Sequence, residues 1–221
     1  LYVHIPFCND ICFYCGCNKQ VTRDHSKSAE YLDVLDKEIE LVKGKISGKT
    51  TVSQLHFGGG SPTFLNNEEI ERLMDLITSR FPLEEGGEFS IEVDPRTCPP
   101  EKVQTLAKVG LNRMSCGVQD FNPDVQKAVN RIQPFEMTRD TMQAAREAGF
   151  HSINMDLIYG LPKQTRKSFE KTLDQVLELS PDRIALYHYA HLPNHFPPQR
   201  RILDADLPGT VEKVHIMMDA I

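Results

Sequence analysis

The sequence predicts an α/β protein whose parallel strands form an open, partial (β/α)6 TIM-like barrel. Short β-rich runs alternate with amphipathic helical stretches along the chain. Strands separated by helices in this way imply right-handed βαβ units and a parallel sheet. Six such units in 221 residues come close to the density of a closed eight-unit barrel, which takes roughly 250 residues. An open barrel is therefore the economical fold.

Six short runs are expected to be strands because they are rich in β-branched and aromatic residues. They comprise residues 2–5, 54–57, 89–93, 113–117, 152–157 and 183–187. Between consecutive strands, apolar residues recur at the i, i+3, i+4 and i+7 positions that share one helix face. Leu32, Leu35 and Ile39 indicate the first helix, and the second is expected after the cap-like pair Asn66 and Asn67.

The later helices are indicated by their ends. The stretches that contain Val103 and Met142 end against Gly110 and Gly149, which suits a glycine just past the last helical turn. A further helical stretch ends at Pro181, because proline cannot continue a helix. These ends complete the alternation of strands and helices on which the predicted fold depends.

The whole chain, residues 1–221, is expected to be one domain. It contains no Ser/Gly-rich linker, internal repeat or low-complexity segment. Because it opens at Leu1 within an apolar run and stops at Ile221 inside a helical pattern, we expect it to be a fragment of a longer protein. An N-terminal segment and a C-terminal domain would then lie outside this sequence.

Composition narrows the class of partner. The chain has 25 Lys and Arg against 31 Asp and Glu, and its net charge of -6 argues against nucleic acid. No run approaches the roughly 18 apolar residues that a membrane span needs. With 40% hydrophobic residues, the chain can bury a core. A monomer is expected.

Four of the six cysteines crowd into ten residues after the first strand. Cys8, Cys12 and Cys15 have the spacing C-x3-C-x2-C, and Cys17 follows. Three thiolates on one loop can hold three corners of a [4Fe-4S] cluster and leave the fourth iron open to a small molecule. A structural zinc site or a ferredoxin would use four ligands, although zinc or a disulfide pair stays open as an alternative, as does ligation by Cys17. Such a cluster favours a reducing compartment, here the cytoplasm.

Several longer motifs occur with the cysteine segment. They are CNDICFYCGC at 8–17, HFGGGSPT at 56–63, IEVDP at 91–95, GVQDF at 117–121, DLIYGLPKQT at 156–165 and YAHLP at 189–193. With these motifs the chain resembles the radical S-adenosylmethionine (SAM) enzymes and, among them, the oxygen-independent coproporphyrinogen III oxidases. The resemblance implies a [4Fe-4S] cluster whose open iron is chelated by the amino and carboxylate groups of SAM. Transfer of one electron would then break a carbon–sulfur bond and give a 5′-deoxyadenosyl radical.

Polar and glycine positions at the strand ends support the same interpretation. Gly58 to Gly60, Glu92, Gln119, Asp156 and Ala190 all lie at or after the carboxyl ends of predicted strands. Because these ends meet at one face of a barrel-like fold, we expect them to surround one cavity with the cysteine loop.

Each of these positions also has a plain structural interpretation. The glycines remove side chains where backbone must approach a ligand, or they form a tight turn. Glu92 can accept from an ammonium or a ribose hydroxyl, or it can pair with Arg96. Asp156 ends an apolar run, where an unpaired charge is costly, so a ribose contact is expected. Arg131 can contact a cofactor or be an ordinary surface cation in a helix.

The resemblance further implies two SAM molecules. Positions that match contacts of the cluster-bound molecule are Tyr2, Gly59 and Glu92. Positions that match contacts of the second are Tyr14, Gly60, Ser61, Gln119, Arg131, Asp156 and Ala190. Ser61 stands where the family often has threonine, and both residues keep a hydroxyl. No catalytic residue is assigned beyond those that hold the cluster and the cofactor.

The reaction implied by the resemblance is oxidative decarboxylation of two propionates of coproporphyrinogen III to vinyl groups. It needs a porphyrinogen substrate and a low-potential electron donor. The alternative is a related haem-binding or haem-delivery protein without oxidase activity. Such relatives typically lack the second cysteine of the CGC element, so Cys17 favours the enzyme. A pure electron carrier is disfavoured because the fourth cluster ligand is missing.

Other candidate ligands receive structural interpretations. Cys98 and Cys116 are expected to be a loop thiol and a small core residue. His188, His191 and His195 follow the last predicted strand on the active face, and packing with hydrogen bonding is favoured there over a second metal.

Overall fold

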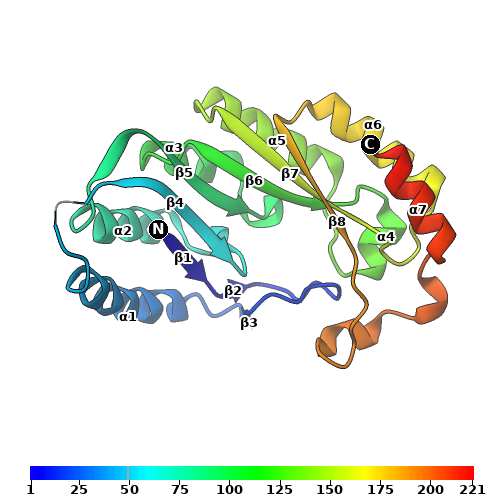
Figure 1. Cartoon of the computed structure of the whole chain (residues 1–221), viewed down its shortest axis with the longest axis horizontal. Helices are drawn as coiled ribbons and strands as arrows, with labels where there is room; N and C mark the ends of the chain where they lie inside the picture. The colour runs from blue at the N-terminus through cyan, green and yellow to red at the C-terminus, as the bar shows by residue number, and fades with distance from the viewer. Residues whose placement is uncertain (49) are drawn as a thin grey trace.

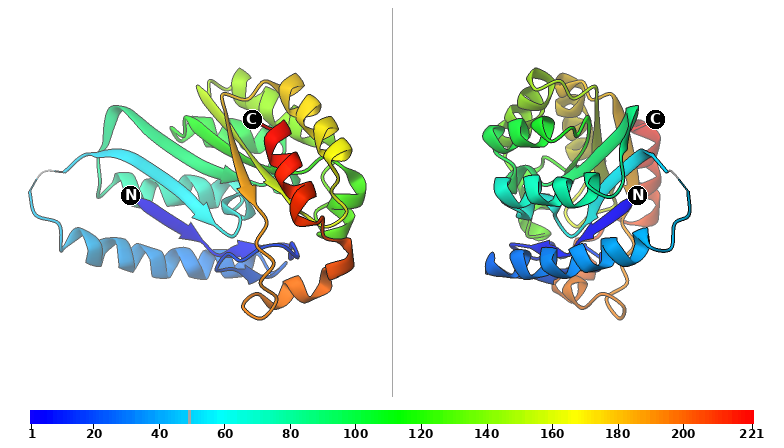
Figure 2. Two further views of the ribbon diagram at one scale, coloured as in Figure 1. Left: turned by 45° about the vertical axis from the view of Figure 1, so that its right-hand side comes forward. Right: turned by 90° about the vertical axis from the view of Figure 1, so that its left-hand side faces the viewer.

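The computed structural model describes residues 1–48 and 50–221. Its main sheet has six strands in the order β1-β4-β5-β6-β7-β8, and every neighbouring pair is parallel. The helices lie along the outer side of this curved sheet (Figures 1 and 2). The predicted open α/β barrel is therefore confirmed, with β1 and β8 as its two edges.

All six predicted strands form, and several are longer than expected. The strands are β1 (Tyr2–Ile5), β2 (Phe7–Cys8), β3 (Gln20–Val21), β4 (Val52–Gly59), β5 (Leu83–Val93), β6 (Arg113–Gln119), β7 (Ser152–Tyr159) and β8 (Arg183–His188). The short strands β2 and β3 pair with each other outside the main sheet. Along β6 buried and partly buried residues alternate, because successive side chains point to opposite faces.

Seven helices connect or follow the strands in the described residues. They are α1 (Ser26–Lys43), α2 (Asn67–Thr78), α3 (Pro100–Lys108), α4 (Pro123–Ala128), α5 (Phe135–Glu147), α6 (Arg166–Leu179) and α7 (Thr210–Asp219). Short 3-10 turns form at Pro62–Phe64, Pro95–Thr97, Pro197–Arg201 and Asp204–Asp206. Helix α4 was not expected from the sequence. It begins where the Asn122 side chain accepts from the backbone N–H groups of Asp124 and Val125.

The helix ends follow the sequence signals. The Asn66 side chain caps α2 and forms a reciprocal capping box with Glu69. Gly110 and Gly149 both adopt positive φ, at 95° and 93°, just beyond α3 and α5. Glycine enters this left-handed region without the steric cost of a Cβ atom. The predicted stops are therefore confirmed.

The apolar core lies between the sheet and the helices. Leu32, Leu35 and Ile39 of α1 are buried on one face, as their spacing predicts. A smaller apolar cluster packs beyond the carboxyl ends of the strands and includes Leu161 and Tyr189. This second cluster supports the cysteine loop, because Phe13 and Tyr14 of that loop pack against it.

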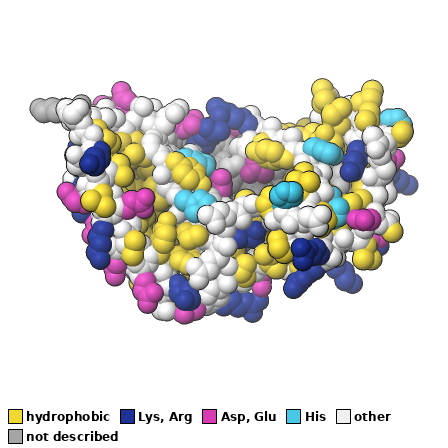
Figure 3. Space-filling view, turned by 60° about the horizontal axis from the view of Figure 1, so that its bottom comes forward, with side chains coloured by type: hydrophobic (Ala, Val, Ile, Leu, Met, Phe, Trp, Pro, Cys, Tyr) yellow, Lys and Arg dark blue, Asp and Glu magenta, His cyan; other side chains and the backbone are white. Residues whose placement is uncertain are grey.

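The inner face of the sheet is polar, which distinguishes it from the filled interior of a closed barrel. It presents a cleft lined by side chains from several strands: His56, Glu88, Ser90, Glu92, Arg113, Ser115, Asn154, Asp156 and Tyr187. The surface of the molecule is hollowed, with histidine and acidic side chains near the hollow (Figure 3). In the described part of the chain, no helix has the length and apolar character needed to cross a membrane.

Candidate functional site

The cysteines lie on a loop whose two ends are tied together. Strand β2 leads into the loop and β3 leads out, and the two strands pair in parallel. The Gln20 N–H donates to the Pro6 carbonyl at 2.7 Å, and the Thr22 N–H donates to the Cys8 carbonyl at 2.9 Å. These bonds close the loop at its base, so its intervening residues fold back over the carboxyl ends of the main strands.

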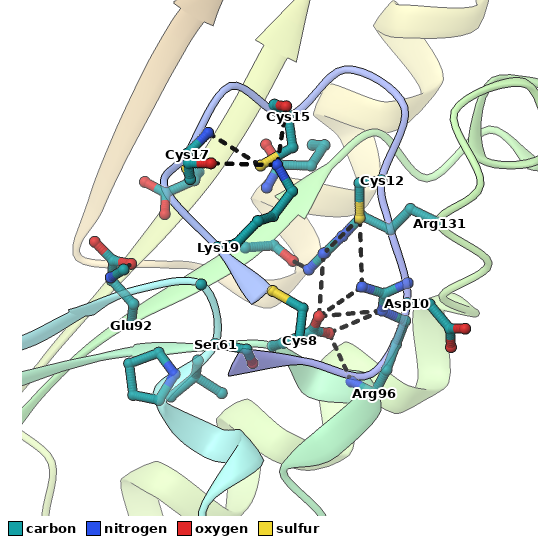
Figure 4. Close-up of a pocket in the computed structure, with 18 of the residues that line it drawn as sticks. Cys8, Asp10, Cys12, Cys15, Cys17, Lys19, Ser61, Glu92, Arg96 and Arg131 are labelled. Atoms are coloured by element: carbon teal, nitrogen blue, oxygen red, sulfur yellow. Dashed lines mark hydrogen bonds and ion pairs between the residues drawn. The ribbon is translucent and has the colours of Figure 1, made fainter. Parts of the chain in front are cut away.

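The four loop cysteines line one cavity (Figure 4). Cys12 is buried, Cys8 and Cys15 are half-buried, and Cys17 is exposed. All four are free thiols. The loop also makes a tight turn in which the Cys15 N–H donates to the Cys12 carbonyl at 3.1 Å. One short segment therefore presents several sulfurs to the same space.

The thiols differ in their acidity. Burial raises the pKa of Cys8 to about 12, and the neighbouring Cys15 and Cys12 add to the rise. A hydrogen bond from the Cys17 thiol lowers the pKa of Cys15 to about 5, and the Cys17 backbone N–H also donates to the Cys15 sulfur at 3.4 Å. Cys17 correspondingly has a raised pKa, because its proton is shared with Cys15. Metal binding to Cys8 would therefore have to displace a firmly held proton.

The glycine turn after β4 holds the cysteine loop against the sheet. The Gly60 N–H donates to the Ile5 carbonyl at 2.8 Å. A Cβ atom at Gly60 would lie 2.7 Å from the Pro6 carbonyl oxygen and 2.9 Å from that of Phe7. Gly59 has a φ of 121°, which also favours glycine. The turn thus lies close to the backbone of the segment that leads into the cysteine loop, and approach of this backbone to a ligand stays a prediction.

Glu92, at the end of β5, faces the cavity. Its carboxylate accepts from the Gly59 N–H at 3.1 Å and lies 3.4 Å from the His56 Nε2. The alternative pairing of Glu92 with Arg96 is wrong, because Arg96 binds Asp94 at 2.6 Å. With 44% of its side chain exposed, Glu92 can still accept further hydrogen bonds from a ligand.

Asp156 occupies the corresponding position on β7. It accepts from the Ser115 hydroxyl at 2.9 Å and from the Asn154 side-chain amide at 2.8 Å. Burial raises the pKa of Asp156. A neutral hydroxyl and an amide thus hold this carboxyl group, and it lines the same cavity as the cysteines.

A buried ion cluster closes the cavity on the side of Cys12. Asp94 pairs with Arg96 at 2.6 Å and with Arg131 at 3.2 Å. Burial opposes ionisation of Asp94, but Arg131 and Arg96 outweigh it and hold the pKa of Asp94 at about 2. Arg131 is 6% exposed and donates to the Gly117 carbonyl at 2.6 Å. The interpretation of Arg131 as a surface cation in a helix is therefore wrong.

Sequence reasoning did not select Asp94. The available signal was a charged residue between the buried Val93 and the turn-forming Pro95. A charge in that position needs a partner if it is buried. The partner Arg131 lies 37 residues away along the chain, beyond the reach of any local pattern.

The structure brings most of the predicted cofactor residues together. Those that line the cavity of the cysteines are Tyr14, Gly59, Gly60, Ser61, Glu92, Gln119, Arg131 and Asp156. Tyr2 and Ala190 are not part of this lining. Tyr2 stacks on His56 with ring centroids 5.8 Å apart. Ala190 is linked to the loop through Gln199, whose side chain donates both to the Ala190 carbonyl and to the Tyr14 carbonyl.

The remaining candidates have structural roles. Cys98 lies in the loop before α3 and Cys116 lies on β6, as expected, and both are fully buried in the main core. His191 bonds the Tyr189 hydroxyl at 2.7 Å and Asp204 at 3.0 Å, in agreement with the expected hydrogen bonding. Over residues 1–48 and 50–221, no three His, Cys, Asp or Glu side chains form a preformed site for a single metal ion.

A family model described as the Radical SAM superfamily matches residues 2–176. The chain belongs to the radical SAM superfamily. A relative from Escherichia coli (strain K12), named oxygen-independent coproporphyrinogen III oxidase, is 51% identical over 221 residues. That match covers 100% of this chain and 48% of the relative. A relative of the same name from Pseudomonas aeruginosa is 50% identical and covers 98% of this chain and 48% of its own length.

Solved structures agree with this radical SAM assignment. The structure described as coproporphyrinogen III oxidase (HemN) from Escherichia coli matches with a TM-score of 0.97 and 51% identity, over 100% of this chain and 50% of that one. The radical SAM methyltransferase TsrM from Kitasatospora setae matches with a TM-score of 0.61 over 87% of this chain and 37% of that one. At 16% identity, TsrM supports the fold alone. The chain spans about half the length of the curated relatives it matches.

Radical SAM proteins use a [4Fe-4S] cluster and SAM, and the cavity fits both groups. Its donor set includes free thiols on a single loop, the ligand type that iron–sulfur clusters require. A Cβ atom at Gly58 would contact the side chains of Tyr2, Glu92 and His56. Because glycine has no Cβ, the backbone of the turn stays accessible there. The buried Nε of Arg131, in the cavity wall, has no hydrogen-bond partner within the described chain. A polar ligand could satisfy it.

Replacement of Gly60 tests the close contact beneath the loop. Gly60→Ala should lower the free energy of unfolding by about 1–3 kcal/mol, because the crowding atoms belong to the backbone and cannot rotate away. Gly44→Ala is the matched control, since its nearest atoms lie 3.6 Å away and its φ is negative, so its effect should stay within about 0.5 kcal/mol. Anaerobic denaturant unfolding measures both, and equal stabilities would contradict the packing argument.

Proposed function

We propose that this protein is an oxygen-independent coproporphyrinogen III oxidase. In this reaction two propionate side chains of coproporphyrinogen III are oxidatively decarboxylated to vinyl groups, which gives protoporphyrinogen IX. The observation that carries the proposal is the 51% identity over the full chain to a curated relative of that name. Haem delivery without oxidase activity is not favoured, because the curated relatives carry the oxidase name and Cys17 completes the CGC element.

We assign Cys8, Cys12 and Cys15 as the three cluster ligands. The spacing C-x3-C-x2-C and the common cavity support this assignment. Cys17 is assigned a different role, because it is exposed and shares its proton with the Cys15 sulfur. When bound, the cluster and SAM supply the one-electron chemistry that activates a carbon–hydrogen bond of the substrate. The chain supplies the thiolates and leaves one iron without a protein ligand.

We assign two groups of residues to SAM. The cluster-bound molecule would contact Tyr2, Gly59 and Glu92, with the Glu92 carboxylate accepting from its ammonium group. Support for this role is that Glu92 is half-exposed and faces the cavity. A second SAM molecule would contact Tyr14, Gly60, Ser61, Gln119, Arg131, Asp156 and Ala190. Its support is that all of these except Ala190 line one cavity, in which the Asp156 carboxyl group can meet a ribose hydroxyl.

The assignment extends to the setting of the reaction. We propose that residues 1–221 act as the radical SAM core domain. The porphyrinogen is the substrate, and a low-potential electron donor supplies the electron. The polar inner face of the sheet, which continues from Glu92 to Asp156, offers hydrogen-bonding groups beside the cofactor cavity. We place the protein in the cytoplasm, because the reduced state of a thiolate-bound cluster needs a reducing compartment. We also propose that the protein is a monomer.

Removal of a ligand thiol tests the cluster assignment. In the complete protein, reconstituted anaerobically, Cys8→Ala, Cys12→Ala and Cys15→Ala should each lose most bound iron and sulfide, because too few thiolates remain. The matched control is Cys98→Ala, which removes a buried thiol of the core and should retain both. Normal iron and sulfide content in any of the three loop variants would refute the ligand assignment.

Neutralisation of Glu92 tests its contact with SAM. Glu92→Gln should weaken SAM binding by about tenfold to a hundredfold, because a charge-assisted hydrogen bond contributes about 1.5–3 kcal/mol. Iron content should not change. Glu84→Gln, an exposed change on the same strand, is the control and should bind SAM normally. Anaerobic equilibrium dialysis with labelled SAM measures the affinities, and an unchanged affinity in Glu92→Gln would exclude this role.

Activity of the complete protein tests the proposed reaction. Anaerobic incubation with coproporphyrinogen III, SAM and a strong reductant should give protoporphyrinogen IX, detected as vinyl-bearing porphyrin by chromatography and mass spectrometry. Omission of SAM should abolish product. Stoichiometric haem binding with no vinyl product would instead support the haem-delivery alternative.

A further inference from the structure

We propose that Arg96 and Arg131, held by Asp94, hydrogen-bond the Cys12 sulfur and raise the reduction potential of the cluster that this sulfur ligates. The inference rests on the proposed assignment of Cys12 as a ligand. It does not depend on the identity of the substrate. In this role the two arginines are positioning residues that act through the thiolate, and the role is separate from the contact of Arg131 with a second SAM molecule proposed above.

Both guanidinium groups contact the sulfur of Cys12. The Arg96 Nη2 lies 3.5 Å from the Cys12 sulfur, and the Arg131 Nη1 lies 3.7 Å from it. These are hydrogen-bond distances for a sulfur acceptor, which is larger than oxygen. Figure 4 shows Arg96 and Arg131 beside Cys12, with dashed lines that join them to its sulfur. Three elements supply the cluster of charges: the cysteine loop, the turn after β5, and the segment after α4.

Asp94 fixes both arginines in this position. Its carboxylate accepts from Arg96 through Nε and Nη2, in the two-point geometry that suits a guanidinium group, and from the Arg131 Nη1. The Arg131 Nη2 is anchored separately at the Gly117 carbonyl. Neither side chain is therefore free to swing away from Cys12, so the two N–H groups are pre-organised toward the sulfur before any cluster binds.

The charges do not cancel. One carboxylate faces two guanidinium groups, so the group carries one surplus positive charge beside Cys12. Asp94 stays ionised because its pKa is held at about 2, which keeps the arrangement intact at neutral pH. Asp94 and Arg131 are almost fully buried, with side-chain exposures of 13% and 8%. Water therefore screens this charge poorly.

The three assigned ligands have different surroundings. In the part of the chain that the structure describes, Cys12 alone among them receives guanidinium N–H groups at its sulfur. The Cys15 sulfur accepts instead from the backbone N–H and the thiol of Cys17, and the ammonium of Lys19 lies near it and binds the carbonyl oxygens of Cys15 and Cys17. The arginine contacts therefore act on one of the three assigned cluster ligands and not on all of them.

The chemical consequence follows from the charge of the cluster. Reduction adds one electron, so a nearby positive charge and hydrogen bonds to a ligating sulfur stabilise the reduced form more than the oxidised one. The potential is thereby raised from the value that three thiolates alone would give. This makes the cluster easier for a biological donor to reduce, although the reduced cluster becomes a weaker reductant.

The test is a redox titration of the complete, anaerobically reconstituted protein without SAM, followed by the electron paramagnetic resonance signal of the reduced cluster. Arg96→Gln should lower the ratio of reduced to oxidised cluster at a fixed potential at least tenfold, which is a shift of about 59 mV for one electron. Arg96→Lys keeps the charge but loses the planar fork, so its shift should be smaller and in the same direction.

The matched control is Arg23→Gln. Arg23 also pairs with a carboxylate of the loop segment, Asp10, at 2.7 Å, but it is 78% exposed. Its removal should change the ratio less than twofold, because water screens its charge. A native potential in Arg96→Gln with full iron content would overturn the inference. If Arg96→Gln loses its iron, the test passes to Arg96→Lys, and a native potential there overturns the inference equally.

The ligand role of Cys12 and the effect of the arginines on it are tested by different variants. Normal iron content in Cys12→Ala would remove the ligand assignment and this inference with it. A cluster that assembles normally and keeps its potential in Arg96→Gln would remove the inference alone. Whether the protein forms vinyl product has no bearing on either result.

Discussion

The site depends on the contact between two backbone segments at the carboxyl end of the sheet. The turn after β4 passes so close to the end of β1 that Gly60 has no room for a side chain against Pro6 and Phe7. This contact fixes where the cysteine loop leaves the sheet. Because the strands are parallel, their carboxyl ends lie at the same edge, and the loop folds over the side chains that those ends present.

The backbone places the cysteine loop, and the charged side chains of the cavity determine the surroundings of that loop. Three carboxyl groups that line the cavity differ in the groups that bind them. Glu92 is half-exposed and accepts from a backbone N–H, Asp156 is held by a hydroxyl and an amide, and Asp94 is buried between two arginines. Glu92 and Asp156 keep capacity for a polar ligand, whereas Asp94 is committed to holding cations beside Cys12. Within one cavity, Glu92 and Asp156 are thus available to a ligand, and Asp94 holds the surroundings of Cys12, a proposed cluster ligand.

Much of this could be predicted from the sequence, because the signals are local. The strands and helices follow from periodicity, and the helix ends follow from Gly110 and Gly149. The positions of Glu92 and Asp156 follow from their places at strand ends. The environment of Arg131 could not be predicted in this way. Its burial is set by a carboxylate 37 residues distant, and a helical pattern gives no information about such a partner.

In the proposed assignment, three cysteines hold the cluster and leave one iron for SAM, and the proposed chemistry depends on this open iron. Mössbauer spectroscopy of the complete protein, reconstituted anaerobically with iron-57, tests this most directly. Addition of SAM should alter the isomer shift of about a quarter of the iron, because one iron of the [4Fe-4S] cluster gains new ligands. A spectrum in which all iron is equivalent and does not respond to SAM would contradict the account.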